Sequence, residues 1–172
     1  MKKHAYLLLF LVLGIQLNAQ NVDRSILKVG FYAAMPIGDA SDLANVGLGF
    51  DLFHHWAISK KFDAGLTTGI QYFFGVDSTI DIGSTSVTTR GDDTIYLPAA
   101  ALLRFFATKA INLGADIGYA FGLVESSESG FYYRPTLGIG VGNSTDLTAS
   151  YTAIELEAGS WNTITLGLVV QF

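Results

Sequence analysis

The stretch from Ile111 to Leu123, Ile-Asn-Leu-Gly-Ala-Asp-Ile-Gly-Tyr-Ala-Phe-Gly-Leu, alternates between mostly large apolar residues and small or polar ones. The apolar set comprises Ile111, Leu113, Ala115, Ile117, Tyr119, Phe121 and Leu123. The residues between them are Asn112, Gly114, Asp116, Gly118, Ala120 and Gly122. Because successive side chains of a β-strand point to opposite faces, this pattern predicts a strand with one apolar face and one small or polar face.

The same period of two recurs on both sides of this stretch and predicts eight strands in all. Their expected ranges are 26–36, 45–57, 62–74, 94–106, 111–123, 131–142, 147–157 and 163–172. In the seventh strand the alternation slips at Ala153-Ile154, which predicts a β-bulge. The connections alternate between tight turns and more variable loops, expected at 37–44, 75–93, 124–130 and 158–161. The longest of these loops is 75–93.

The face that carries the large apolar residues decides between two kinds of barrel. A soluble barrel of the lipocalin kind would place them inside, and this is the alternative to the fold proposed here. An eight-stranded barrel has a narrow lumen that cannot hold so many large side chains from every strand. They must therefore face outward into lipid, where a closed barrel also satisfies every backbone hydrogen bond. The sequence predicts an all-β, eight-stranded antiparallel up-and-down transmembrane β-barrel.

The first twenty residues have a different character. Lys2, Lys3 and His4 form a basic start, an apolar run follows from Tyr6 to Ile15, and Ala19 precedes Gln20. This is the pattern of a secretory signal peptide. A single membrane-anchor helix is the alternative, but the run is shorter than the ~20 residues that a span needs. We therefore expect a signal peptide at 1–19 and the barrel domain at 20–172.

Composition narrows the function classes. The chain has 172 residues, enough for one domain, and only 15% of them are charged. Cysteine is absent, which excludes disulfides, thiolate metal sites and a lipoprotein anchor. Residues 20–172 carry eight basic and fifteen acidic side chains, a net charge of −7. Without a basic stripe to neutralise phosphates, we expect no nucleic-acid partner. The sequence also predicts no cofactor.

The final segment, Leu166-Gly167-Leu168-Val169-Val170-Gln171-Phe172, resembles the closing strand of bacterial outer-membrane barrels. Residues 20–172 as a whole resemble the small OmpA/OmpX-like outer-membrane β-barrel family. The middle third, with Ile95-Tyr96-Leu97-Pro98, Arg104-Phe105-Phe106 and Leu113 to Tyr119, is similar to porT-like barrels. The resemblance implies a location in the bacterial outer membrane and contact with outer-membrane lipid and lipopolysaccharide. It also implies that Phe172 carries the signal read by the barrel-assembly machinery. The oligomeric state is left open.

Six ionisable residues fall on the predicted lumen face of the strands. They are Lys28, Asp51, Asp63, Arg104, Asp116 and Arg134. Such a set could form an ion or proton path or a polar ligand site. It could equally form a paired network that fills the interior, because a buried charge is costly without a partner. Equal numbers of each sign and a narrow lumen favour the network, and Tyr32, Tyr96 and Tyr132 are expected to help close the lumen.

Two other features suggest chemistry less strongly. His54 and His55 are adjacent, so they face opposite sides of a strand and cannot serve one site; His55 is expected in the lumen. The predicted external loops carry an acidic set, comprising Asp39, Asp42, Asp77, Asp81, Asp92, Asp93, Glu125 and Glu128. This set could bind divalent cations that bridge lipopolysaccharide phosphates, but its spacing matches no calcium loop and favours a solvated rim.

These observations favour a structural or surface-interaction protein with a side-chain-filled lumen. The alternative is a narrow channel or binding protein for small solutes. A lipid-modifying barrel enzyme ranks third, because no catalytic serine motif is present.

Overall fold

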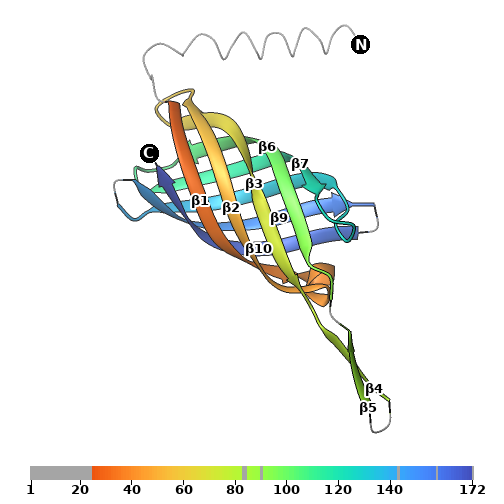
Figure 1. Ribbon diagram of the computed structural model, residues 1–172. Helices are drawn as coiled ribbons and strands as arrows, with labels where there is room; N and C mark the ends of the chain where they lie inside the picture. Colours follow the sequence, from red (N-terminus) through yellow and green to blue (C-terminus); the bar gives the residue numbers. More distant parts are fainter. Residues whose placement is uncertain (1–24, 83–84, 90, 143, 158, 172) are drawn as a thin grey trace, which may run out of the picture.

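The computed structural model describes residues 25–82, 85–89, 91–142, 144–157 and 159–171. Eight strands form one closed antiparallel barrel, shown in Figure 1. The strands are β1 (Ser25–Ile37), β2 (Ala44–Ala57), β3 (Phe62–Gly75), β6 (Thr94–Phe106), β7 (Ile111–Gly122), β8 (Gly130–Gly140), β9 (Thr145–Leu156) and β10 (Gly159–Gln171). Each strand pairs with its neighbours in the chain, and β1 pairs with β10 to close the ring. The predicted fold class is therefore confirmed. The predicted signal peptide, residues 1–19, lies outside the described residues.

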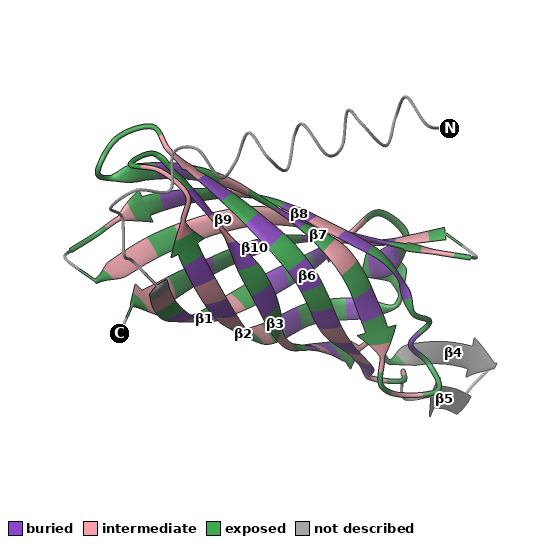
Figure 2. Ribbon diagram, turned by 90° about the horizontal axis from the view of Figure 1, so that it is seen from above, coloured by how far each residue is buried: buried purple, intermediate pink, exposed green. Residues whose placement is uncertain are grey.

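Burial alternates along the strands as the sequence pattern requires, which Figure 2 shows as alternating exposed and buried bands. On β7, Ile117 is 54% exposed on the outside while its neighbour Asp116 is completely buried. On β10, Leu166 is 62% exposed and Thr165 is buried. The outer wall is thus apolar and the inner face polar. This arrangement suits a barrel whose solvent on the outside is lipid.

The bulge predicted at Ala153-Ile154 is wrong. Strand β9 keeps a constant register with β8 and with β10 through this point, from Glu155 opposite Phe131 to Asp146 opposite Gly140. Ile154 is apolar yet faces inward, where it is completely buried. The alternation slips in the sequence because the apolar Ile154 occupies an inward position, and no extra residue is inserted in the strand. A register shift does occur in β2, between Ala44 and Val46.

The two ends of the barrel differ. The connections from β2 to β3, β6 to β7 and β8 to β9 are short, and we call this the turn end. At the opposite loop end, the 3-10 helix η1 (Gly38–Asp42) follows β1 and buries Ala40. The region 75–93, expected to be a loop, contains β4 (Ser78–Ile82) and β5 (Thr85–Thr89). These two strands pair with each other and project beyond the barrel (Figure 1). Within the described ranges, no helix is long and apolar enough to cross a membrane.

Candidate functional site in the barrel lumen

The centre of the lumen holds a network of four charged side chains from four strands. Asp116 of β7 accepts hydrogen bonds from Arg104 of β6 and from Arg134 of β8, the latter from Nε at 2.9 Å. Arg134 Nη2 lies 2.8 Å from the same carboxylate, and its Nη1 donates to Asp51 of β2 at 2.6 Å. We call these four residues the central network. Each of them is at most 7% exposed, and each charge has a partner of opposite sign.

Local sequence explains why these groups meet. Asp116 and Arg134 are direct cross-strand partners, and Arg104 lies opposite Gly114. A methyl group at Gly114 would lie 2.6 Å from Arg104 Nη1, so the glycine leaves the space that the guanidinium occupies. Arg134 also sits over the ring of Phe53, with 5.6 Å to the centroid, a distance typical of cation–π contacts. Aromatic faces therefore add to the ionic partners that hold the guanidinium.

A second set of charges lies nearer the turn end. Lys28 Nζ is 3.5 Å from Asp146 Oδ2, and His55 Nδ1 is 3.7 Å from Asp63 Oδ2. Asp146 was not among the predicted lumen residues, because it was assigned to a turn. Asp146 has the same strand parity as the inward residues Thr148 and Ser150, and this parity could have identified it as a lumen residue. His55 faces the lumen as expected, whereas His54 lies on the outer wall, with its ring 4.5 Å from that of Trp56.

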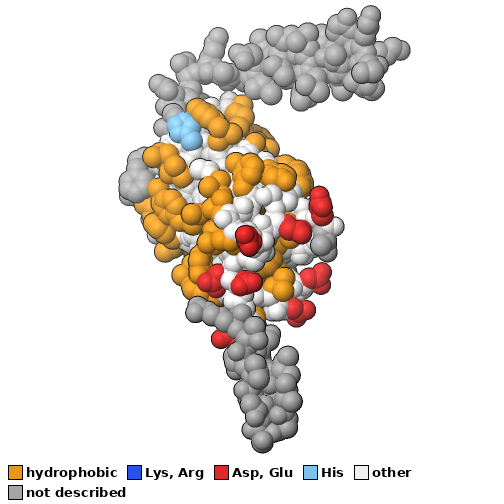
Figure 3. Space-filling model, turned by 45° about the vertical axis from the view of Figure 1, so that its right-hand side comes forward, with side chains coloured by type: hydrophobic (Ala, Val, Ile, Leu, Met, Phe, Trp, Pro, Cys, Tyr) orange, Lys and Arg blue, Asp and Glu red, His pale blue; other side chains and the backbone are white. Residues whose placement is uncertain are grey.

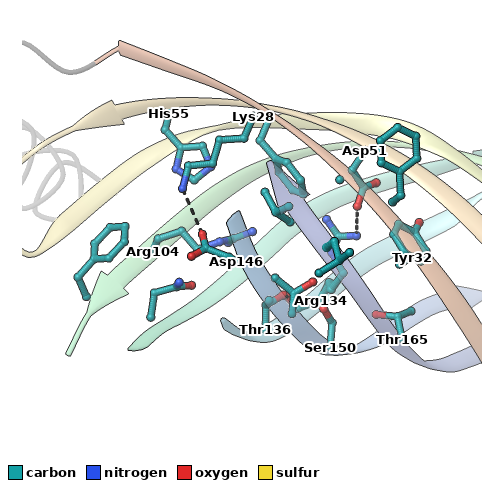
Figure 4. A pocket seen from close by; sticks show the side chains of 18 residues that line it. Lys28, Tyr32, Asp51, His55, Arg104, Arg134, Thr136, Asp146, Ser150 and Thr165 are labelled. Atoms are coloured by element: carbon teal, nitrogen blue, oxygen red, sulfur yellow. Dashed lines mark hydrogen bonds and ion pairs between the residues drawn. The ribbon is translucent and has the colours of Figure 1, made fainter. Parts of the chain in front are cut away.

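The structure therefore places all six predicted lumen residues inside the barrel, where they fall into two separate groups. Asp51, Arg104, Asp116 and Arg134 form the central network, whereas Lys28 and Asp63 pair with Asp146 and His55 instead. A cavity of about 40 Å³ is lined by members of both groups. Figure 4 shows Lys28, His55, Arg104 and Asp146 toward one side of it and Arg134 with Asp51 toward the other. By its size it has room for a few water molecules.

The loop-end half of the lumen is filled by a different kind of cluster, which we call the aromatic plug. It consists of Phe73, Tyr96, Tyr132, Ile154 and Trp161, each at most 4% exposed. The ring of Trp161 lies 5.1 Å from that of Phe73 and 5.7 Å from that of Tyr96, both at steep angles. Tyr96 and Tyr132 were expected to close the lumen. Phe73 and Trp161 were missed, although both lie on the polar face of their strands.

The loop end carries the acidic rim, which Figure 3 shows as acidic side chains gathered around that end of the molecule. Asp39, Asp42, Asp77, Asp92, Glu125 and Glu128 are exposed there. In the part of the chain that the structure describes, no group of three or more histidines or carboxylates is arranged to hold a metal ion. The acidic rim is thus a diffuse negative surface. Phe172, the predicted assembly signal, lies outside the described residues.

A closed eight-stranded antiparallel barrel with an apolar wall, a polar interior and one end of short turns defines a class. It is the fold of the small β-barrels of bacterial outer membranes, in agreement with the location predicted from the sequence.

Solved structures of this class superpose on the chain. The attachment invasion locus protein Ail of Yersinia pestis matches with a TM-score of 0.55 and 16% identity, covering 86% of this chain and 97% of Ail. The N-terminal β-barrel domain of OprF from Pseudomonas aeruginosa matches with a TM-score of 0.53 and 12% identity, covering 87% and 100%. A de novo designed transmembrane β-barrel also matches, with a TM-score of 0.53 and 8% identity, covering 89% and 100%. No family model matches the sequence, and no curated protein matches it. At these identities the likeness concerns the fold.

Proposed function

We propose that the chain is an integral outer-membrane protein with a structural or surface-interaction role and a lumen that does not conduct. The observation that carries this proposal is the filling of the lumen by two successive layers. The aromatic plug occupies the loop-end half, and the central network spans the barrel from β2 to β8 below it. A solute would have to displace buried rings and separate paired charges to pass.

We infer a role in surface interaction from the position of the loop end. With the turn end in the periplasm, the acidic rim and the β4–β5 hairpin lie on the outside of the cell. The apolar wall would contact outer-membrane lipid and lipopolysaccharide, and the barrel-assembly machinery would act on the chain during insertion. A structural or interaction role needs no catalytic group, and the fold is shared with Ail, the attachment invasion locus protein.

The polar cavity of about 40 Å³ is the observation that favours the second candidate, a narrow channel or small-solute binding protein. Its lining contains Lys28, Arg104, Asp51 and Asp146, groups that could coordinate a small ion. The aromatic plug would have to move before such an ion could cross the membrane.

Single-channel recording in planar bilayers tests the proposal. The protein would be purified from bacterial outer membranes, with insertion checked by its heat-dependent migration in gels. We expect no conductance steps from the wild type. The triple variant Phe73→Ala, Trp161→Ala, Arg134→Ala removes two rings from the plug and the guanidinium that joins Asp51 to Asp116. It opens both layers and serves as the matched control, which is expected to conduct. Stable, reproducible steps from the wild type would overturn the closed lumen and place the channel first.

A further inference from the structure

A shallow groove of about 540 Å³ runs along the outer wall over β7, β8, β9 and β10. Its outward-facing lining combines the small residues Pro135 and Ala149 with larger apolar ones, namely Leu113, Leu137, Tyr151 and Ile164. Ala149 pairs directly with Leu137 on β8 and with Leu166 on β10. A small side chain between longer ones leaves a depression in the wall. In a membrane this depression must be filled by hydrocarbon, because water is absent there.

Above the groove, toward the loop end, lies a group of polar side chains that we call the Tyr–Glu cluster. It consists of Tyr133, Tyr151, Glu155, Ser160 and Asn162. Tyr151 both lines the groove and donates from its hydroxyl to Asn162 Oδ1 at 2.9 Å. Tyr133 donates to Glu155 Oε1 at 3.3 Å, and its ring centroid is 6.4 Å from that of Tyr151. Contacts within the cluster thus connect the groove to a carboxylate.

The only formal charge in the cluster is negative. Each tyrosine hydroxyl uses its one proton inside the cluster, and Asn162 Nδ2 donates to Ser160 Oγ at 2.8 Å. The second N–H of Asn162 and the hydroxyl proton of Ser160 remain as neutral donors. The exposed carboxylate of Glu155 keeps free lone pairs and the only formal charge of the cluster. A ligand that matches this charge carries a positive group with N–H donors, and its own acceptor oxygens can take hydrogen bonds from Asn162 and Ser160. The adjacent aromatic rings also favour a cation.

The charges around the cluster also favour a cationic ligand. The acidic rim lies beyond the cluster, and the described parts of the loop end contain no lysine or arginine (Figure 3). A headgroup with phosphate as its only charged group would be repelled by Glu155 and by the rim. An ammonium group would be attracted by both. The cluster also lies among the outward aromatic residues Tyr119, Phe121 and Phe131, which in barrels of this class mark the level of the headgroups.

We propose that the groove and the Tyr–Glu cluster together bind one membrane lipid whose headgroup carries a primary amine. An acyl chain of this lipid fills the groove beside Ala149, and its ammonium group contacts Glu155 beside the tyrosine rings. This inference rests on membrane insertion of the barrel but not on the closed lumen, so conductance and lipid binding can fail separately.

Native mass spectrometry of the protein purified from outer membranes in detergent tests the inference. The protein would be titrated with phosphatidylethanolamine or phosphatidylglycerol of identical acyl chains, which differ in the presence of the amine. We expect the Kd of the first bound phosphatidylethanolamine to be about fivefold lower than that of phosphatidylglycerol, as one exposed ion pair allows. Glu155→Gln should remove this preference. Ala149→Phe, which fills the groove, should weaken the binding of both lipids.

Glu157→Gln is the matched control, since Glu157 is an exposed acid two residues away and outside the cluster. It should keep the wild-type preference. Both positions face outward or lie in a connection, and heat-dependent gel migration would verify that each variant is folded. Equal affinity of the wild type for the two lipids would overturn the inference. So would a Glu155→Gln variant that retains the preference, because the carboxylate would then not recognise the amine.

Discussion

Replacing Asp116 by asparagine tests the central network most directly. The substitution keeps the size of the side chain and removes the charge that lies between Arg104 and Arg134. Arg134 would keep its 2.6 Å contact with Asp51, whereas Arg104 would keep only the carbonyl oxygens of Leu103 and Ala115, at 3.1 and 3.4 Å. One buried guanidinium would thus be left without an anionic partner.

The size of the effect follows from that lost partner. Breaking a buried ion pair by removing one member typically costs about 3–5 kcal/mol. The asparagine oxygen still accepts one hydrogen bond, so we expect the lower end, about 3 kcal/mol in the free energy of unfolding. At urea slopes of ~1–3 kcal/mol per M, the unfolding midpoint should fall by about 1–3 M.

Urea unfolding in lipid vesicles, followed by the fluorescence of Trp56 and Trp161, measures this change. Asp39→Asn is the control, since Asp39 is exposed on η1 and should change stability by less than about 0.5 kcal/mol. The double variant Arg104→Gln, Asp116→Asn should lose less than the two single variants together, because the unpaired guanidinium is then absent. A stability of Asp116→Asn equal to that of Asp39→Asn would refute the role assigned to the central network.

Two further predictions concern the wall and the packing of the lumen. Ile117 lies near the middle of β7 and faces outward, so Ile117→Arg should destabilise the inserted barrel by about 2–4 kcal/mol. Ile139, one residue before the end of β8, should tolerate arginine at a cost of only about 0–1 kcal/mol, and equal effects in vesicle unfolding would contradict the proposed membrane depth. A methyl group at Gly49 would overlap the ring of Tyr32 inside the barrel, so Gly49→Ala should cost about 1–3 kcal/mol. The double variant Gly49→Ala, Tyr32→Leu should recover part of that loss, and no recovery would show that the clash lies elsewhere.

The strands were predictable because each has a two-residue period and the apolar face can point only outward. Strand β6 was expected at 94–106, the range it occupies. The start of β10 was placed four residues late, at 163, because Trp161 breaks the pattern of small and polar inward residues. The β4–β5 pair was missed, since its Ser- and Thr-rich strands have only five residues each, too few for a two-residue period to stand out.

The lumen was predictable in content but not in pairing. Side-chain direction follows from strand parity, so Asp51, Asp63 and Arg134 could be placed inside from sequence alone. Which of them meet depends on the tilt of the strands and on the register around the ring. Arg134 of β8 reaches Asp51 of β2 across the lumen, between strands that are not neighbours in the sheet. No pattern along one strand contains that information.

The β4–β5 hairpin extends beyond the charges of the acidic rim. A strand of five residues at ~3.4 Å per residue spans roughly 17 Å. The screening length at physiological salt is about 8 Å, so the far end of the pair, at Ile82 and Thr85, lies roughly two screening lengths from the strand ends nearest the rim. A partner that meets the hairpin there is therefore nearly indifferent to the negative field of the rim, whereas one that approaches the mouth of the barrel is not. Ionic strength should separate these two modes of approach.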